Sequence, residues 1–452
     1  MEPNTPLTTE ASDRETTRQQ RDQPAYFDEQ KRKSRVKMAG LMIILLLLVI
    51  QTSNQGLSQL TSGQGWASVL YPQMVTQNNI LPVINQAGHI DQTTTRHQAS
   101  LTPQQYIDLI VSHLTRDQKL GQMMMVQFVG ANYSEALASM LNQYHVGNIL
   151  LFSANGNIID KDQLKSLTQN IRQASSALPP SIALDQEGGT VDRLQQLDGP
   201  RPSEAEIGAT NSIEYARTIG KQTAADLTSY GINLNLAPVV DVDNDPTSEL
   251  HQDMRTFGTT SDSVTRMAGA YLQGLQESQQ VVGTLKHFPG LGDASVDPHV
   301  GLPTITRSKA ELENTDWAPY HALIMQGLVH AIMVTHEMIP AIDPNKPSSL
   351  SPALVQGILR QEMGFQGVIM TDSLTMAGIA AYYSPDQAAA LAIEAGSDII
   401  MGASSPDEVA TMLNGIKQAL DTGTLQPARI DQSVRRILLM KYQMGLLPIP
   451  KQ

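Results

Sequence analysis

The sequence predicts an α/β protein built as a (β/α)8 barrel of the TIM type. From about residue 101 onward, short apolar runs alternate with longer amphipathic stretches, which is the pattern of repeated β-α units. Most of these runs are apolar throughout, as parallel strands are when both faces are covered. Several of them end on an ionisable residue. A single barrel domain with insertions, residues 101–452, accounts for all three observations.

Eight runs qualify as the barrel strands. Helical periodicity fills the gaps between them, for example in residues 161–177, 213–230, 261–277 and 353–363. The predicted strands, in chain order, are residues 122–128, 148–152, 181–185, 232–240, 281–287, 331–336, 367–372 and 397–402.

Ionisable residues close five of the predicted strands: Asp185, Asp241, His287, His336 and Asp372. The carboxyl ends of parallel barrel strands meet at one rim, where a ligand can contact residues that are distant in the chain. The sequence therefore predicts a polar site on this rim.

The stretch KHFPGLGDASVDPHVGLP, residues 286–303, follows the fifth strand and contains three glycines and three prolines. No helix or strand tolerates that mixture. It also carries a lysine, two histidines and two aspartates. We interpret it as a shaped rim loop that aims side chains.

Composition excludes several classes of function. The 31 basic and 44 acidic residues give a formal charge of -13, which argues against binding to nucleic acid. The hydrophobic content of 41% suffices for a proper core. The absence of cysteine rules out disulfides, thiolate nucleophiles and cysteine metal sites.

The N-terminal region predicts export. A polar tail, residues 1–37, ends in the basic stretch KRKSRVK, and thirteen apolar residues follow. No Asp, Glu, Lys or Arg occurs in residues 38–90, so we expect a transmembrane signal anchor over residues 38–57 with its N-terminus inside. A cleaved signal peptide and a buried soluble helix are the alternatives. Residues 58–100, rich in Gln, Thr, Ser and Asn, are a predicted linker. The barrel would then lie outside the cytoplasm, anchored or secreted.

Residue chemistry alone leaves two interpretations for each candidate. Asp372 ends an apolar strand, where it is either a reactive carboxylate or the cap of the next helix. In DPH, Asp297 either orients His299 as a proton donor or forms a turn beside a passive surface histidine.

The roles of the remaining candidates are equally undecided by residue chemistry alone. Lys286 and His287 are either donors to sugar hydroxyls or partners of a nearby acid. The stretch LDQEGGTVDRL contributes Asp185 and Arg193, and Arg255 in DMRTFG would ordinarily form a solvated salt bridge.

Together these segments resemble glycoside hydrolase family 3, and within it the bacterial β-N-acetylglucosaminidases. The matching stretches are LDQEGGTVDRL, GINLNLAPVVDV, DMRTFGTT, KHFPGLGDASVDPHVGLP and LSPALVQGILRQEMGFQGVIMTDSLTM. They occur in the family's order, and the resemblance extends over roughly residues 101–447.

The resemblance implies a retaining exo-glycosidase that removes terminal β-linked N-acetylglucosamine, from cell-wall or chitin-derived fragments. Asp372 would be the nucleophile, and His299 the acid/base with Asp297 as its dyad partner. We expect a monomer that needs no metal or organic cofactor. The implied sugar-binding positions are Asp185, Arg193, Arg255, Lys286, His287 and, nearby on the rim, His336.

Two positions depart from the family pattern. Leu291 stands where the family usually has a histidine, and Ser373 where many members have an aspartate. A β-glucosidase of the same family and a sugar-binding protein that has lost catalysis therefore stay as alternatives. A metal-dependent hydrolase is a third, with His287, His299, His336, Asp185 and Asp372 as ligands.

Overall fold

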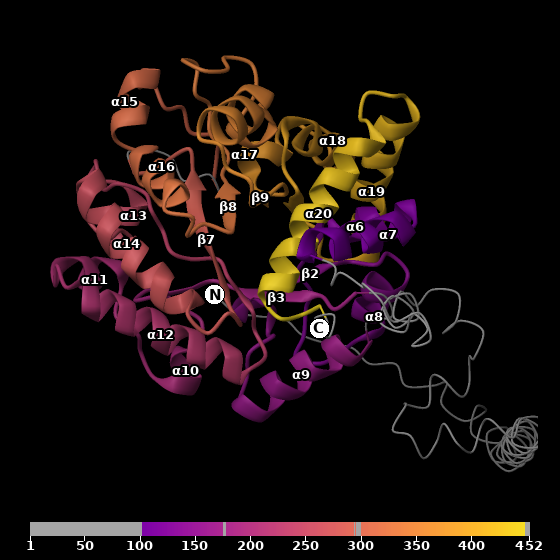
Figure 1. Cartoon of the computed structure of the whole chain (residues 1–452), viewed down its shortest axis with the longest axis horizontal. Coiled ribbons are helices and arrows are strands. Elements are labelled where there is room, and N and C mark those ends of the chain that lie inside the picture. Colours follow the sequence, from indigo (N-terminus) through magenta and orange to yellow (C-terminus); the bar gives the residue numbers. More distant parts are fainter. Residues whose placement is uncertain (1–101, 175–177, 293, 295–299, 448–452) are drawn as a thin grey trace, which may run out of the picture. The chain divides into compact units, whose positions relative to one another are not determined.

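The computed structural model describes residues 102–174, 178–292, 294 and 300–447, and it forms a closed barrel of eight parallel strands. Going round the barrel, the strands follow one another in chain order, and β1 pairs with β10 to close it. Helices surround the strands (Figure 1). The predicted (β/α)8 barrel is confirmed.

Each of the eight predicted apolar runs overlaps one barrel strand, and β7 and β9 end one residue beyond their predicted runs. The fourth is much shorter than predicted: the ladder stops at Asn235, and Pro238, which follows closely, has no N–H to donate. The barrel strands are β1 (Met124–Val126), β2 (Asn148–Leu150), β3 (Ser181–Leu184), β6 (Leu234–Asn235), β7 (Val282–Phe288), β8 (Ala331–Val334), β9 (Val368–Ser373) and β10 (Ile399–Met401). A small antiparallel hairpin, β4 (Gln186–Gly188) and β5 (Val191–Asp192), follows β3.

The four predicted helices are all present. Three are α-helices, α9 (Lys161–Ala174), α12 (Ile213–Ser229) and α14 (Ser261–Gln276), and the fourth, η3 (Ala353–Glu362), is wound as a π-helix. The other long α-helices are α6 (Pro103–His113), α7 (Arg116–Gln122), α8 (Glu135–Asn142), α16 (Ala318–Met325), α18 (Pro385–Ala395), α19 (Pro406–Asp421) and α20 (Pro427–Gln443). Shorter helical segments are η1 (Ser153–Asn155), α10 (Gln195–Asp198), α11 (Glu204–Ala209), α13 (Glu249–Gln252), α15 (Lys309–Asn314), η2 (Ser348–Leu350) and α17 (Ala377–Ala380).

The predicted membrane anchor, residues 38–57, lies outside the described residues, as do the tail and linker on either side of it. Among the residues that the structure describes, no helix is both long and apolar enough to cross a membrane.

One charged side chain is buried at the amino-terminal end of the barrel. Lys441 of α20 is fully buried, and its Nζ donates to Gln122 Oε1 at 2.7 Å and to the Gly147 carbonyl at 2.8 Å. Gln122 is the last residue of α7, just before β1, and Gly147 directly precedes β2. The lysine therefore connects α20 to the starts of these two strands. Burial lowers the pKa of Lys441 to about 7.

This lysine should make stability depend on pH. Its pKa is lower in the folded than in the unfolded chain, so the unfolded chain binds more protons and stability rises as the pH increases above 7. Relative to Lys441→Met, the wild type should gain on the order of 2 kcal/mol of unfolding free energy between pH 7 and 9, measured by urea denaturation. Lys417→Met, at an exposed salt bridge, is the control and should parallel the wild type. Parallel curves for Lys441→Met as well would contradict the prediction.

Candidate active site

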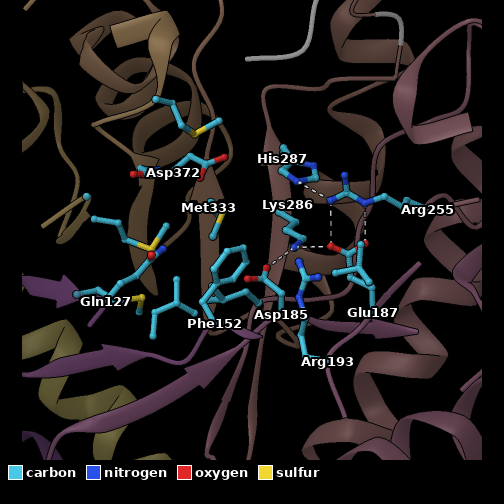
Figure 2. Close-up of a pocket in the computed structure, with 18 of the residues that line it drawn as sticks. Gln127, Phe152, Asp185, Glu187, Arg193, Arg255, Lys286, His287, Met333 and Asp372 are labelled. Atoms are coloured by element: carbon cyan, nitrogen blue, oxygen red, sulfur yellow. Dashed lines mark hydrogen bonds and ion pairs between the residues drawn. The ribbon is translucent and has the colours of Figure 1, made fainter. Parts of the chain in front are cut away.

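A cavity of about 490 Å³ opens over the carboxyl ends of the barrel strands (Figure 2). Residues of six of the eight barrel strands line it, together with Asp185 directly after β3, Leu236 directly after β6 and residues of the loops, so the lining residues run from Met125 to Gly402. The lining residues used below are Gln127, Phe152, Asp185, Glu187, Arg193, Arg255, Lys286, His287, Met333, Asp372, Met376 and Met401.

A buried ion network forms one side of the cavity. Lys286 Nζ lies 2.8 Å from Asp185 Oδ1 and 2.6 Å from Glu187 Oε1. Arg255 binds the same Glu187 carboxylate in a two-pronged manner, with Nε at 2.8 Å from Oε2 and Nη2 at 3.0 Å from Oε1. The Glu187 and Lys286 side chains are only 1% and 3% exposed. β3, β4, β7 and the loop after α13 are thereby held together by charge.

The members of this ion network keep each other ionised. Burial alone would raise the pKa of Glu187, but Lys286 and Arg255 outweigh it and hold that pKa far below its usual range. Burial would likewise lower the pKa of Lys286, whereas Asp185 and Glu187 reverse the effect and raise it. The cavity therefore presents fixed charges across the neutral pH range.

His287 is oriented by an acid behind it. Asp241 is fully buried, and its Oδ2 accepts from the His287 Nδ1 at 2.7 Å and from the His287 backbone N–H at 3.1 Å. Its Oδ1 accepts from the Leu291 N–H at 2.8 Å. With the proton on Nδ1, His287 Nε2 is left as an acceptor, and Arg255 Nη2 lies 3.4 Å from it.

A second buried acid supports the ion network. Both carboxylate oxygens of Glu204, in α11, lie within hydrogen-bond distance of the Val239 N–H, at 3.0 and 3.2 Å. Burial, followed by the nearby charge of Glu187, raises the pKa of Glu204 well above its usual range. The protonated, neutral form of Glu204 is thereby favoured, which limits the negative charge buried beside Glu187.

Asp372 lies on the other side of the cavity from the ion network, close to Met333 (Figure 2). It is half-buried at the end of β9, and its Oδ1 accepts from the Ser373 N–H at 2.7 Å. The alternative that Asp372 caps the next helix does not hold, because the N-cap residue of α17 is Met376. Asp372 therefore points its carboxylate at the cavity.

The other sequence candidates divide into three groups. Arg193 lines the cavity, with its guanidinium 5.1 Å from the centre of the Phe152 ring, and Arg255 is a partly buried partner of Glu187 rather than a solvated surface residue. His336 does not line the cavity; it is fully buried against Ser349 and the Ser373 carbonyl. Asp297 and His299 lie outside the described residues.

Three residues that matter here were missing from the predicted site: Glu187, Glu204 and Asp241. Asp241 was recognisable as a strand-end acid, and Glu187 stands within a quoted motif. Glu204 had no sequence signal beyond its position at the start of a capped helix. In the part of the chain that the structure describes, no group of three or more His, Asp or Glu residues is placed to hold a metal ion.

These features define a barrel protein with a small-molecule cavity at the carboxyl ends of its strands, the position used by barrel enzymes. The sequence profile of the glycosyl hydrolase family 3 N-terminal domain matches residues 115–440. The chain belongs to glycoside hydrolase family 3.

Known members of the family align over most of the barrel. The β-hexosaminidase LpqI of Mycobacterium tuberculosis is 34% identical over 330 residues, which are 72% of this chain and 82% of that protein. A β-hexosaminidase of Nitrosomonas eutropha is also 34% identical, over 69% of this chain and 90% of its own. The solved structure of a family 3 β-N-acetylglucosaminidase from Paenibacillus sp. FPU-7 superposes with a TM-score of 0.71 at 33% identity, covering 74% of this chain and 63% of that one.

Neutralising the centre of the ion network should be costly. Glu187→Gln leaves Lys286 and Arg255 buried without their shared carboxylate, so we expect a loss of about 3 kcal/mol or more in unfolding free energy at pH 7, by chemical denaturation. Because the pKa of Glu187 is lowered in the folded state, this loss should shrink as the pH falls below the usual carboxyl range.

Glu277→Gln is a matched control for this substitution. Glu277 also has two basic partners, Arg217 and Lys221, each at 3.0 Å, but its side chain is 45% exposed. Its removal should change stability little, because solvent screens exposed pairs. Equal losses of unfolding free energy in the two variants would show that burial does not make the ion network more important for stability than an exposed one.

Proposed function

We propose that the protein is a retaining exo-glycosidase that hydrolyses terminal β-linked N-acetylglucosamine. The observation that carries the proposal is the placement of Asp372 across one cavity from the polar set of Asp185, Lys286, His287 and Arg255. The names of the related β-hexosaminidases and of the Paenibacillus β-N-acetylglucosaminidase support this choice of sugar.

In the first step, the ionised Asp372 attacks the anomeric carbon while the glycosidic bond to the departing oxygen breaks. Protonated His299, assisted by Asp297, gives its proton to that oxygen. A covalent bond between Asp372 and the sugar results. In the second step, the now neutral imidazole accepts a proton from water, whose oxygen displaces Asp372. Two displacements at the same carbon retain the β configuration.

The charged side of the cavity suits the hydroxyl groups of one sugar ring. Asp185 offers carboxylate acceptors, whereas Lys286, Arg193 and Arg255 offer N–H donors, and His287 Nε2 is an acceptor. Ion pairs through Glu187 fix Asp185, Lys286 and Arg255 before the sugar arrives, and Asp241 fixes His287, so little order among these residues has to be created on binding. Asp372 is left to face the anomeric carbon.

Loss of the nucleophile should abolish turnover. We expect Asp372→Ala to reduce kcat on a chromogenic β-N-acetylglucosaminide by about 10⁴-fold or more, since the covalent route is removed. Asp407→Ala, an exposed aspartate at the start of α19, is the control and should retain full activity. Chelator treatment should leave the wild type active.

The matching β-glucoside should be cleaved much more slowly than the N-acetylglucosaminide. Faster cleavage of the glucoside would favour the β-glucosidase alternative. Absence of cleavage of either substrate by the wild type would favour a sugar-binding protein, and loss of activity with a chelator, restored by a divalent metal, would favour the metal-dependent alternative.

We also propose that the enzyme is a monomer held outside the cytoplasm by a signal anchor at residues 38–57, with residues 1–37 inside, a linker over residues 58–100 and the barrel from residue 101. The basic flank and the uncharged stretch of residues 38–90 support this orientation. The family profile matches residues 115–440, so the anchor rests on the sequence.

The anchor can be tested by fractionation. The full chain should sediment with membranes and stay there after alkaline carbonate, and deletion of residues 1–57 should release it as an active soluble protein. If expression of the full chain instead released a shortened protein into the medium, with a new N-terminus identified by mass, the segment would be a cleaved signal peptide.

A further inference from the structure

His336 lies behind the proposed nucleophile rather than in the cavity wall. It follows β8 at the barrel rim, and its side chain is fully buried. Its Nδ1 lies 2.7 Å from the Ser349 hydroxyl in η2, and its Nε2 lies 2.9 Å from the Ser373 carbonyl oxygen at the end of β9. The imidazole thus bridges η2 and the end of β9.

The carbonyl fixes the direction of these hydrogen bonds. A carbonyl oxygen only accepts, so His336 must carry a proton on Nε2 and donate it to Ser373. In the neutral ring, Nδ1 then accepts from the Ser349 hydroxyl. Ser349 is itself buried, next to Ser348, whose hydroxyl donates to the Thr335 carbonyl at 2.5 Å. Ser349 in η2 therefore fixes the imidazole ring, and the ring in turn fixes the Ser373 carbonyl at the end of β9.

Ser373 is the residue that aims Asp372. Its N–H donates to Asp372 Oδ1 at 2.7 Å, and in the described part of the chain this is the only hydrogen bond recorded for that carboxylate. The pairing of β9 with β10 is irregular at this point, with a shift before Met401 meets Ser373. Around this shift the Leu374 N–H donates to the Met401 carbonyl and the Met376 N–H to the Ser373 carbonyl, both at 3.0 Å. The hydrogen bond from His336 adds a side-chain constraint on the same Ser373 carbonyl from the residue that follows β8.

We propose that His336 is a positioning residue for the nucleophile: through Ser373 it fixes the backbone that orients the Asp372 carboxylate, and it does not contact the sugar. The inference rests on the proposed function, because it takes Asp372 as the attacking group. Displacement of a reacting group by about 1 Å can cost roughly 10²-fold in rate, so a buried side chain outside the cavity can control turnover.

Two substitutions separate the hydrogen bond from the volume of the ring. The amide of His336→Gln can still donate from its nitrogen to Ser373 and accept from Ser349 with its oxygen. His336→Leu fills similar space without either hydrogen bond. The rate of covalent labelling of Asp372 at saturation is read by mass after reaction with a 5-fluoro N-acetylglucosaminyl fluoride, and binding is read from the Kd of N-acetylglucosamine.

We expect the labelling rate of His336→Leu to fall about 10²-fold while its Kd stays within about threefold of the wild type. His336→Gln should recover most of that rate. Ser349→Ala, which removes the partner on the far side of the ring, should lower the rate in the same direction by a smaller factor.

Three results would overturn the inference. A labelling rate for His336→Leu within threefold of the wild type would show that Asp372 needs no such support. Equal defects in the Leu and Gln variants would show that the donated hydrogen bond is not what matters. A weaker Kd with an unchanged saturated rate would make His336 a substrate contact.

Crystal structures of the wild type and His336→Leu test the same point without turnover. We expect the Asp372 carboxylate to move by about 1 Å or more while Lys286 and Arg255 stay in place, and a shift below about 0.5 Å would reject the inference. If the wild type proved inactive, the proposed function would fail, and this comparison alone would still decide the role of His336.

Discussion

The contact between Lys286 and Glu187 is the interaction on which the rest of the site depends. A lysine with a 3% exposed side chain, facing the end of a barrel strand, is stable only if acids meet it, and here two of them do. Glu187 in turn needs Arg255, which binds it through two N–H groups. The requirement for charge balance therefore draws the hairpin after β3 and the loop after α13 against β7. The ion pairs Lys286–Asp185, Lys286–Glu187 and Arg255–Glu187 therefore shape this side of the cavity.

Asp241 extends the same logic to the loop that begins with Lys286. One carboxylate holds the His287 ring, the His287 backbone and the Leu291 N–H. The segment KHFPGL, residues 286–291, is thus anchored at His287 and at Leu291. Leu291, which is 8% exposed, stands where the family pattern usually has a histidine. Because Leu291 is held through its backbone, this anchoring does not require a particular side chain.

Much of the barrel was predictable from the sequence, because both faces of its strands are buried and apolar runs report this directly. The rule that ionisable residues at strand ends meet on one rim correctly brought Asp185, His287 and Asp372 together. It could not distinguish a side chain that faces the cavity from one that turns away, and so it placed His336 with the sugar-binding group. Strand ends also gave no indication that Glu187 and Arg255, 68 residues apart, share one ion pair. Partnership across such distances depends on which loops fold over the rim, and apolar periodicity carries no information about that.

The acids around the cavity differ in how fully their oxygens are engaged, and this difference explains how similar carboxylates can do different work. Asp185 and Glu187 bind cations, Asp241 binds a histidine and two backbone N–H groups, and Glu204, whose pKa is raised by burial, accepts from the Val239 N–H. In the described part of the chain, Asp372 has no cationic partner within salt-bridge distance, and the thioether side chains of Met333, Met376 and Met401 line the same cavity. A carboxylate whose lone pairs are occupied by an ion pair is a poor nucleophile, whereas one held by a single backbone N–H beside apolar groups keeps lone pairs for attack. The site therefore separates the acids that build it from the proposed nucleophile, and the separation is made by the partners each acid finds rather than by the type of residue.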